Sequence, residues 1–204
     1  MSEAKREINH PDPSALGLFG LAMVTWVAST QKLDLTHGLS FAIPWAIFLG
    51  AGAQLIAGIL DYKKGNVFGA TAFCGYGLFW LGVVMSWLIS LGAFGETLTA
   101  SANLDTRQLG VAFVGYLIFT LFLTVGALET NKVLFVIFVL IDVLFVGLSL
   151  TSFGIMPEVF HKVAAVSEML IALLSFYAAG ANVLNNHFGR AFLPIGKPFG
   201  VIAR

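Results

Sequence analysis

The sequence predicts an all-α integral membrane protein with six transmembrane helices and with both termini in the cytoplasm. Of its 204 residues, 58% are hydrophobic and only 11% are charged, whereas about a quarter of the residues in a soluble domain are charged. The apolar residues gather in six long runs, which short stretches of charged and turn residues separate. This composition excludes a water-soluble globular protein.

The six runs have the length of membrane-spanning helices, which need about 20 apolar residues to cross a bilayer. None alternates between apolar and polar residues as the strands of a membrane barrel do, so we expect helices. The connections are too short to hold an inserted soluble domain. We expect an N-terminal cytoplasmic segment at 1–14, one membrane domain at 15–184 and a cytoplasmic tail at 185–204, with spans at 15–31, 39–60, 67–91, 107–128, 133–156 and 163–184.

The distribution of basic residues predicts the orientation. Eight Lys and Arg residues belong to one side of the membrane in this topology, and three belong to the other. The larger group contains Lys5, Arg6, Lys63, Lys64, Lys132, Arg190, Lys197 and Arg204, and the smaller group contains Lys32, Arg107 and Lys162. Because the side rich in Lys and Arg faces the cytoplasm, both termini are expected there.

Several classes of function are not expected from this chain. Eleven basic residues balance eleven acidic ones, and no basic run interleaved with aromatic residues indicates a nucleic-acid partner. Cys74 is the single cysteine, and the four histidines fall in separate loops or helix ends, so no metal site is predicted. We also find no nucleotide-binding glycine loop and no set of catalytic residues. The sequence therefore predicts neither an enzyme nor a bound cofactor.

Small and polar residues share several of the spans. Glycine and alanine let transmembrane helices pack closely, and Thr25, Gln54 and Tyr76 lie near such residues in the first three spans. Two interpretations are open: the small residues serve close packing alone, or some of them line a narrow polar path with these three side chains.

Two acidic residues lie inside apolar runs, Asp142 in the fifth span and Glu168 near the start of the sixth. A charged side chain at membrane depth costs about 2.5 to 3.5 kcal/mol, so each of them is a candidate for proton coupling. The alternative for Asp142 is a neutral acid bonded to a neighbouring helix. The alternatives for Glu168 are a position at the membrane interface or a pairing with His161, two helical turns before it.

Five segments of the sequence carry a resemblance to a known family. They are Leu16-Gly17-Leu18-Phe19-Gly20, Gly52-Ala53-Gln54-Leu55-Ile56-Ala57-Gly58, the stretch 62–73 (YKKGNVFGATAF), Tyr76-Gly77-Leu78-Phe79-Trp80, and the stretch 183–196 with its Asn185-Asn186-His187-Phe188-Gly189-Arg190 core. Their order and the six spans resemble the acetate uptake transporter family over nearly the whole chain.

The resemblance implies a small carrier or channel of the plasma membrane for acetate and, in some members of the family, succinate. It also implies that the protein works as an anion channel or a proton-coupled symporter, is surrounded by lipid, and assembles as a homohexamer with one path per subunit. The family's narrow apolar constriction joins three side chains, whose positions fall on Leu21, Tyr76 and Ile141 in this sequence.

Such a constriction suits a monocarboxylate, because an apolar ring can pass a dehydrated methyl group while nearby donors hold the carboxylate. Gln54, Thr25 and the Tyr76 hydroxyl are the expected donors. No Lys or Arg lies deep in a span, so we expect weak and fast passage rather than tight capture. A structural or sensory membrane protein that transports nothing is the competing hypothesis.

Overall fold

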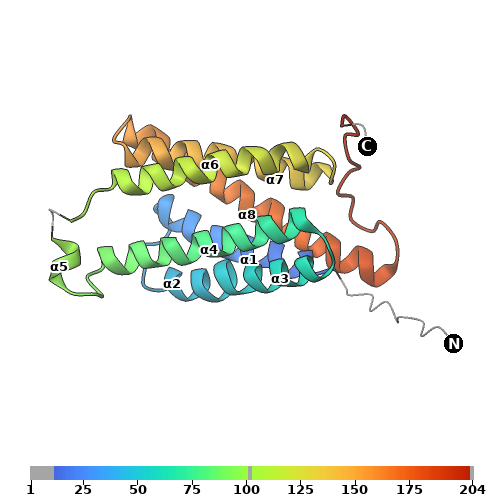
Figure 1. Ribbon diagram of the computed structural model, residues 1–204, viewed down its shortest axis with the longest axis horizontal. Helices are drawn as coiled ribbons and strands as arrows, with labels where there is room; N and C mark the ends of the chain where they lie inside the picture. The colour runs from blue at the N-terminus through green and yellow to red at the C-terminus, as the bar shows by residue number, and fades with distance from the viewer. Residues whose placement is uncertain (1–11, 101–102, 203–204) are drawn as a thin grey trace.

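The computed structural model describes residues 12–100 and 103–202, whose regular structure is helical (Figure 1). The elements are α1 (Ser14–Lys32), α2 (Ala42–Trp45), the π-helical segment η1 (Ala46–Ala53), α3 (Gln54–Lys63), α4 (Val67–Ser90), α5 (Glu96–Thr99), α6 (Arg107–Ala127), α7 (Lys132–Ser152) and α8 (Pro157–Phe188). In these residues, six helical stretches are long and apolar enough to cross a membrane, with α2, η1 and α3 forming one of them. The predicted all-α membrane fold with six spans is confirmed, and the cytoplasmic location of both termini stays a prediction. Of the basic residues that predicted the orientation, Lys5, Arg6 and Arg204 lie outside the described residues.

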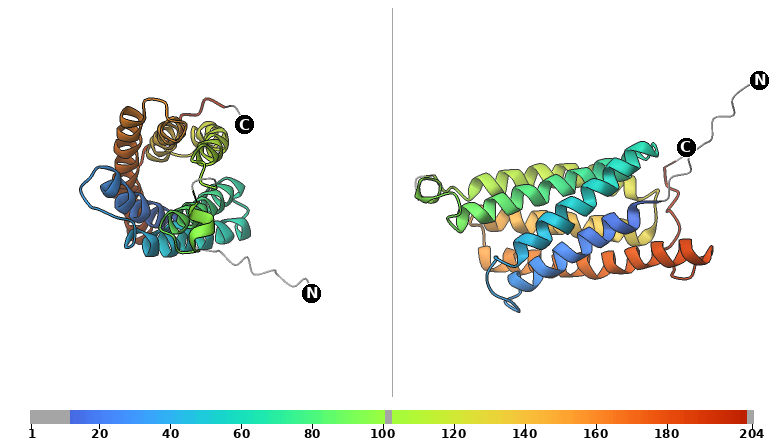
Figure 2. Two further views of the ribbon diagram at one scale, coloured as in Figure 1. Left: turned by 90° about the vertical axis from the view of Figure 1, so that its left-hand side faces the viewer. Right: turned by 90° about the horizontal axis from the view of Figure 1, so that it is seen from below.

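The six spans form a ring around a common axis (Figure 2, left). Helix α8 packs between α1 and α7, and α6 packs on the other side of α7. Helix α4 packs against η1 and α3, which in turn contact α1. Helices α4 and α6 touch at few positions, so this is the loosest seam of the ring.

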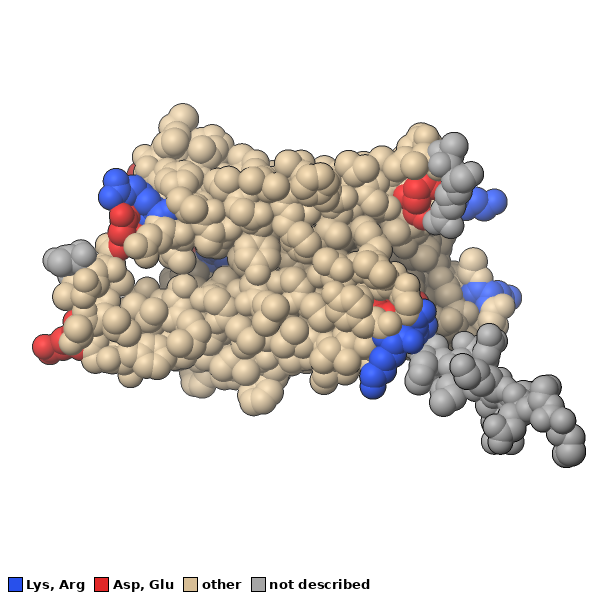
Figure 3. Space-filling view, viewed as in Figure 1, with Lys and Arg blue, Asp and Glu red and all other residues tan. Residues whose placement is uncertain are grey.

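The beginning of α1 and the end of α8 lie at the same end of the bundle (Figure 1). We call this end proximal and the opposite end distal. An even number of spans requires this arrangement, and the basic residues predict that the proximal end faces the cytoplasm. Charged residues occupy the two ends of the face in Figure 3, with a broad uncharged belt between them. Such a belt is what a bilayer requires of the surface that it covers.

Most helix boundaries agree closely with the predicted spans, and the sixth span differs most. It was predicted at 163–184, but α8 runs from Pro157 to Phe188. Proline fits the first turn of a helix because its missing N–H needs no partner there. The helix ends where Gly189 takes a φ of 62°, a conformation that costs glycine little. Hydropathy alone missed both ends, because the added turns are polar.

Close helix packing explains several of the glycines. A Cβ on Gly20 would lie 2.5 Å from the Leu49 carbonyl oxygen, and a Cβ on Gly58 would lie 2.9 Å from the Cys74 backbone nitrogen. At these two positions glycine allows the backbones to touch. By contrast, nothing lies within 4 Å of a Cβ on Gly180.

The segment after α8 folds back over the turn between α6 and α7. The Val133 N–H donates to the Ile195 carbonyl oxygen at 3.1 Å, and the Phe199 N–H donates to the Leu128 carbonyl oxygen at 2.9 Å. Asn185, in the last turn of α8, holds the start of this segment: its Oδ1 accepts from the N–H groups of Phe192 and Leu193 at 2.7 and 2.8 Å. The tail is therefore fastened to the proximal end of the bundle.

Candidate transport pathway

The three predicted constriction residues are buried in the same hydrophobic cluster inside the bundle. Leu21, Tyr76 and Ile141 belong to one cluster of buried side chains, and their exposed fractions are 7%, 5% and 4%. Tyr76 follows the start of α4 by nine residues, and Ile141 follows the start of α7 by nine, which places both about 14 Å from their proximal helix ends. Leu21 lies about 10 Å from the start of α1 on the same measure. Three helices thus contribute apolar side chains at a similar depth.

Hydrogen bonding and aromatic contacts fix the orientation of Tyr76. Its hydroxyl oxygen lies 2.9 Å from the hydroxyl oxygen of Thr120 on α6. The single hydroxyl hydrogen of Thr120 points to the Tyr116 carbonyl oxygen at 2.7 Å, so Tyr76 is the donor in the first bond. Its ring also makes an edge contact with Phe119 at a centroid distance of 5.9 Å. The hydroxyl that was expected to hold a carboxylate is already bonded within the protein.

An aromatic cluster lies on the distal side of Tyr76, one helical turn further along α4. The ring of Phe79 contacts Tyr116 at 4.9 Å, Phe145 at 5.3 Å and Trp80 at 5.5 Å between centroids. Sequence reasoning placed Phe79 in a family motif but gave it no role. Its spacing was a usable signal, because Phe79 follows Tyr76 by three residues and side chains three apart share a helix face. Together these rings fill the centre of the bundle beside the constriction.

Two of the expected carboxylate donors are bonded to their own helices. The Thr25 hydroxyl donates to the Leu21 carbonyl oxygen at 2.7 Å, and the Gln54 side-chain nitrogen donates to the Gly50 carbonyl oxygen at 2.7 Å. Both residues are fully buried. Gln54 keeps one unpaired group, because its Oε1 has no hydrogen-bond partner among the described residues.

Asp142 lies between α7 and α6, one residue after Ile141. Its Oδ2 accepts from the Thr124 hydroxyl at 2.7 Å, and its buried Oδ1 has no hydrogen-bond partner in the described part of the chain. The Thr124 hydroxyl oxygen also lies 3.0 Å from the Thr120 carbonyl oxygen. Thr120 and Thr124, one turn apart on α6, therefore bond to Tyr76 and to Asp142 respectively.

Glu168 pairs with Lys32, the last residue of α1, and not with His161. The Lys32 ammonium lies 2.8 Å from Glu168 Oε2, and the exposed fractions of the two side chains are 15% and 2%. The predicted depth of Glu168 also needs correction, because α8 begins six residues earlier than the predicted span. In the sequence, Lys32 directly follows the predicted span at 15–31, and nothing there indicated a partner on another helix. Its long side chain, whose aliphatic stem can lie along apolar surface, reaches Glu168.

The Lys32–Glu168 pair borders a cavity inside the distal half of the ring. This distal cavity has a volume of about 130 Å³, which is room for several water molecules. Its other walls come from α4, α6 and α7 and are apolar or aromatic. The lining consists of Lys32, Phe79, Trp80, Val83, Trp87, Phe113, Leu144, Leu148 and Glu168.

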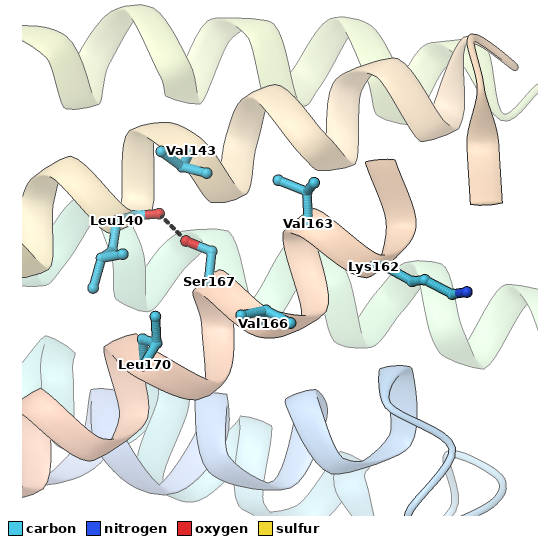
Figure 4. A pocket seen from close by; sticks show the side chains of 7 residues that line it. All are labelled: Leu140, Val143, Lys162, Val163, Val166, Ser167 and Leu170. Carbon is cyan, nitrogen blue, oxygen red and sulfur yellow. Dashed lines mark hydrogen bonds between the residues drawn. The ribbon is translucent and has the colours of Figure 1, made fainter. Parts of the chain in front are cut away.

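A second hollow lies on the outside of the bundle, between α7 and α8 (Figure 4). Val143, Val166 and Leu170 line it and are exposed on the outer surface. The Ser167 hydroxyl donates to the Leu140 carbonyl oxygen across it at 2.6 Å. This groove faces away from the ring axis, so it is not part of a path through the subunit.

Another buried acid, Asp61, lies near the proximal end of α3 and was not predicted from the sequence. Its side chain has an exposed fraction of 0%, and neither carboxylate oxygen has a hydrogen-bond partner among the described residues. The carboxylate lies against Gly69 at the start of α4, where a Cβ would collide with it. Asp61 sits at the end of an apolar run, where a charged residue is ordinarily read as exposed.

Six helices able to span a membrane, arranged as a ring around a buried apolar cluster and a distal cavity, are typical of membrane proteins of the channel and carrier class. The chain belongs to the GPR1/FUN34/yaaH family, whose model matches residues 2–195.

Relatives with known roles support this assignment. The Escherichia coli K12 protein described as the succinate-acetate/proton symporter SatP is 35% identical over 187 residues, covering 91% of this chain and 95% of that protein. Acetate permease A of Emericella nidulans is 31% identical over 151 residues, covering 70% of this chain and 49% of that protein. A solved structure of the bacterial acetate channel SatP superposes with a TM-score of 0.83 at 34% identity, covering 92% of this chain and 99% of that one. These relatives are transporters and channels, not enzymes.

Proposed function

We propose that this protein carries acetate, and with it other small carboxylates such as succinate, across the plasma membrane by a path through the middle of each subunit. The burial of Leu21, Tyr76 and Ile141 in one cluster, at a similar depth on three helices, is the observation that supports this most directly. The relatives are described as carrying acetate or succinate with protons, or as an acetate channel.

The constriction would select by size and by the cost of dehydration. An apolar ring favours the methyl end of acetate, whereas each hydrogen bond with water that the carboxylate loses there costs free energy. Because the hydroxyls of Thr25 and Tyr76 and one N–H of the Gln54 amide are bonded within the protein, the path offers few ready partners to the carboxylate. Weak binding of this kind suits rapid passage.

Flux into liposomes tests the proposal. Purified protein should let labelled acetate enter vesicles faster than empty vesicles do, and an imposed inward proton gradient should separate the two modes. A channel passes acetate without net proton movement, whereas a symporter concentrates acetate inside and alkalinises the outside. Vesicles that behave like empty ones would favour the structural or sensory alternative.

For proton coupling we propose Asp142. The hydroxyl of Thr124 has one hydrogen and two acceptors within 3.0 Å, namely Asp142 Oδ2 and the Thr120 carbonyl oxygen. An ionised Asp142 takes that hydrogen. A protonated Asp142 can donate to the Thr124 hydroxyl instead, and the Thr124 hydrogen then turns to the Thr120 carbonyl oxygen. The side-chain hydroxyl of the same Thr120 accepts from the Tyr76 hydroxyl. Protonation of the acid is thereby linked to the helix that positions the constriction. Glu168 is the second candidate, with its charge already balanced by Lys32.

We also propose that the protein assembles as a homohexamer in lipid. Many large apolar side chains point outward from the ring, including Phe48, Phe122 and Val111 with exposed fractions of 72%, 76% and 65%. Lipid or neighbouring subunits must cover them. Native mass spectrometry in a mild detergent should find six copies, and a monomer as the sole species would overturn the proposal.

A further inference from the structure

The distal cavity contains two charged side chains, and they neutralise each other. Lys32 comes from α1 and Glu168 from α8, whereas every lining residue from α4, α6 and α7 is apolar or aromatic. His161 is another ionisable group near the pair and lies two helical turns before Glu168 on α8. The ammonium and the carboxylate are 2.8 Å apart, so the cavity carries no net charge while both are ionised.

The pair lies deep enough to act on a permeating ion. Lys32 follows the start of α1 by 18 residues, and Glu168 precedes the end of α8 by 20, which places them about 27 and 30 Å from the proximal helix ends. Tyr76 lies about 14 Å from that end. The pair and the cavity that it borders therefore lie on the distal side of Tyr76, further along the direction of the proposed path.

The cost of entering such a cavity depends on the charge of the solute. Moving an ion from water into a poorly polarisable site carries a Born penalty, which rises with the square of the charge. A neutral ion pair does little to offset that penalty, whereas an unpaired ammonium would attract a dianion twice as strongly as a monoanion. The pair thus sets which charge state of solute the cavity admits.

We propose that Lys32 and Glu168 form a charge filter that favours monocarboxylates over dicarboxylates. Glu168 offsets the attraction of the Lys32 ammonium for dianions, and Lys32 offsets the repulsion of anions by the buried carboxylate. This inference rests on the proposed function, since it assumes that carboxylates pass through the ring.

Removing one charge at a time gives opposite predictions. In proteoliposomes, Glu168→Gln leaves the ammonium unpaired, and the ratio of succinate to acetate influx should rise about tenfold. Lys32→Gln leaves a carboxylate unpaired, and the same ratio should fall about tenfold while acetate influx also declines. These sizes follow from the Coulomb energy of one unit charge about 10 Å from the solute at an effective dielectric constant of about 20. A dianion feels this energy twice and a monoanion once, and the difference corresponds to about tenfold in the flux ratio. The double variant Lys32→Gln with Glu168→Gln is neutral and should restore the wild-type ratio to within about threefold.

A matched control is Lys162→Gln, which removes a positive charge on α8 that faces the outer groove rather than the cavity (Figure 4). It should leave the flux ratio unchanged. If a single variant fails to fold, Val83→Lys and Val83→Asp add one charge of each sign to the cavity wall with the pair intact, and they should shift the ratio up and down respectively.

The outcomes separate the two proposals. Wild-type protein that carries no acetate overturns the proposed function. Normal wild-type flux, combined with folded variants whose ratios stay constant or move in the same direction, overturns the charge filter and assigns the pair to helix packing.

Discussion

Shortening Tyr76 to alanine tests the proposed path at its predicted constriction. Tyr76→Ala removes a ring that is 5% exposed and that contacts Phe119 and Phe138 at centroid distances of 5.9 and 6.3 Å. Truncating a buried aromatic residue costs about 3 to 5 kcal/mol of stability, so the variant should melt at a lower temperature. The widened ring should also admit larger solutes. A barrier for lactate lowered by about 1.4 kcal/mol relative to acetate would raise the lactate-to-acetate flux ratio about tenfold.

Two nearly isosteric variants separate width from hydrogen bonding. Tyr76→Phe and Thr120→Val each break the 2.9 Å bond between the two hydroxyl oxygens while leaving the ring in place. Each should lower stability by about 0.5 to 1.5 kcal/mol and leave the lactate-to-acetate ratio unchanged. Dual-label flux measurements in the same vesicles give this ratio directly. If the ratio in Tyr76→Ala equals that of the wild type, the solute does not pass this residue, and the path must be drawn elsewhere.

Three further substitutions probe other parts of the structure. Asp142→Asn should abolish the dependence of acetate uptake on an imposed pH gradient, because asparagine cannot ionise. The carboxylate that accepts from the Thr124 hydroxyl is thereby lost, and a hydrogen bond to a charged group is worth about 1.5 to 3 kcal/mol. A pH dependence equal to that of the wild type would make Asp142 structural. Gly58→Ala should lower stability by about 1 to 3 kcal/mol, since its Cβ would press on the α4 backbone, whereas the control Gly180→Ala has open space and should be neutral or slightly stabilising in a thermal melt. Asn185→Ala should release the tail to limited proteolysis by removing three hydrogen bonds at about 1 kcal/mol each, and Asn186→Ala, which bonds to its own helix, should not.

Local sequence patterns predicted the six spans because each depends on the composition of one continuous stretch. The run that begins at Val67 needs only its own apolar residues and the cap that Asn66 provides, where Oδ1 accepts from the Gly69 N–H at 3.1 Å. The same local reasoning missed the first turns of α8, where the polar residues His161 and Lys162 continue the helix. Hydropathy reports where lipid contacts the chain, and α8 extends past that region.

The constriction was placed by resemblance rather than by physics. Composition indicates that Tyr76 is apolar enough to be buried, but three helices must be arranged around an axis before Leu21 and Ile141 can stand beside it. The carboxylate donors were predicted from residue type, which does not show whether a polar group already has a partner within the protein. A threonine in a helix bonds to the carbonyl three or four residues before it, so Thr25 satisfies itself before any solute arrives.

The pairing of Glu168 shows why such long-range partners escape a reading of the sequence. His161 was a reasonable partner because helical spacing places it near the acid, whereas Lys32 is 136 residues away in the chain. Yet the alternatives were not equal in energy. A carboxylate that is 2% exposed needs a partner that can follow it into the bundle, and a lysine at a helix end has a flexible stem long enough to do so. A buried acid near one end of a membrane bundle is therefore better paired with a basic residue at the end of a neighbouring helix than with one on its own helix. In a ring, the helices that neighbour the last span are the preceding span and the first one, as α7 and α1 are for α8.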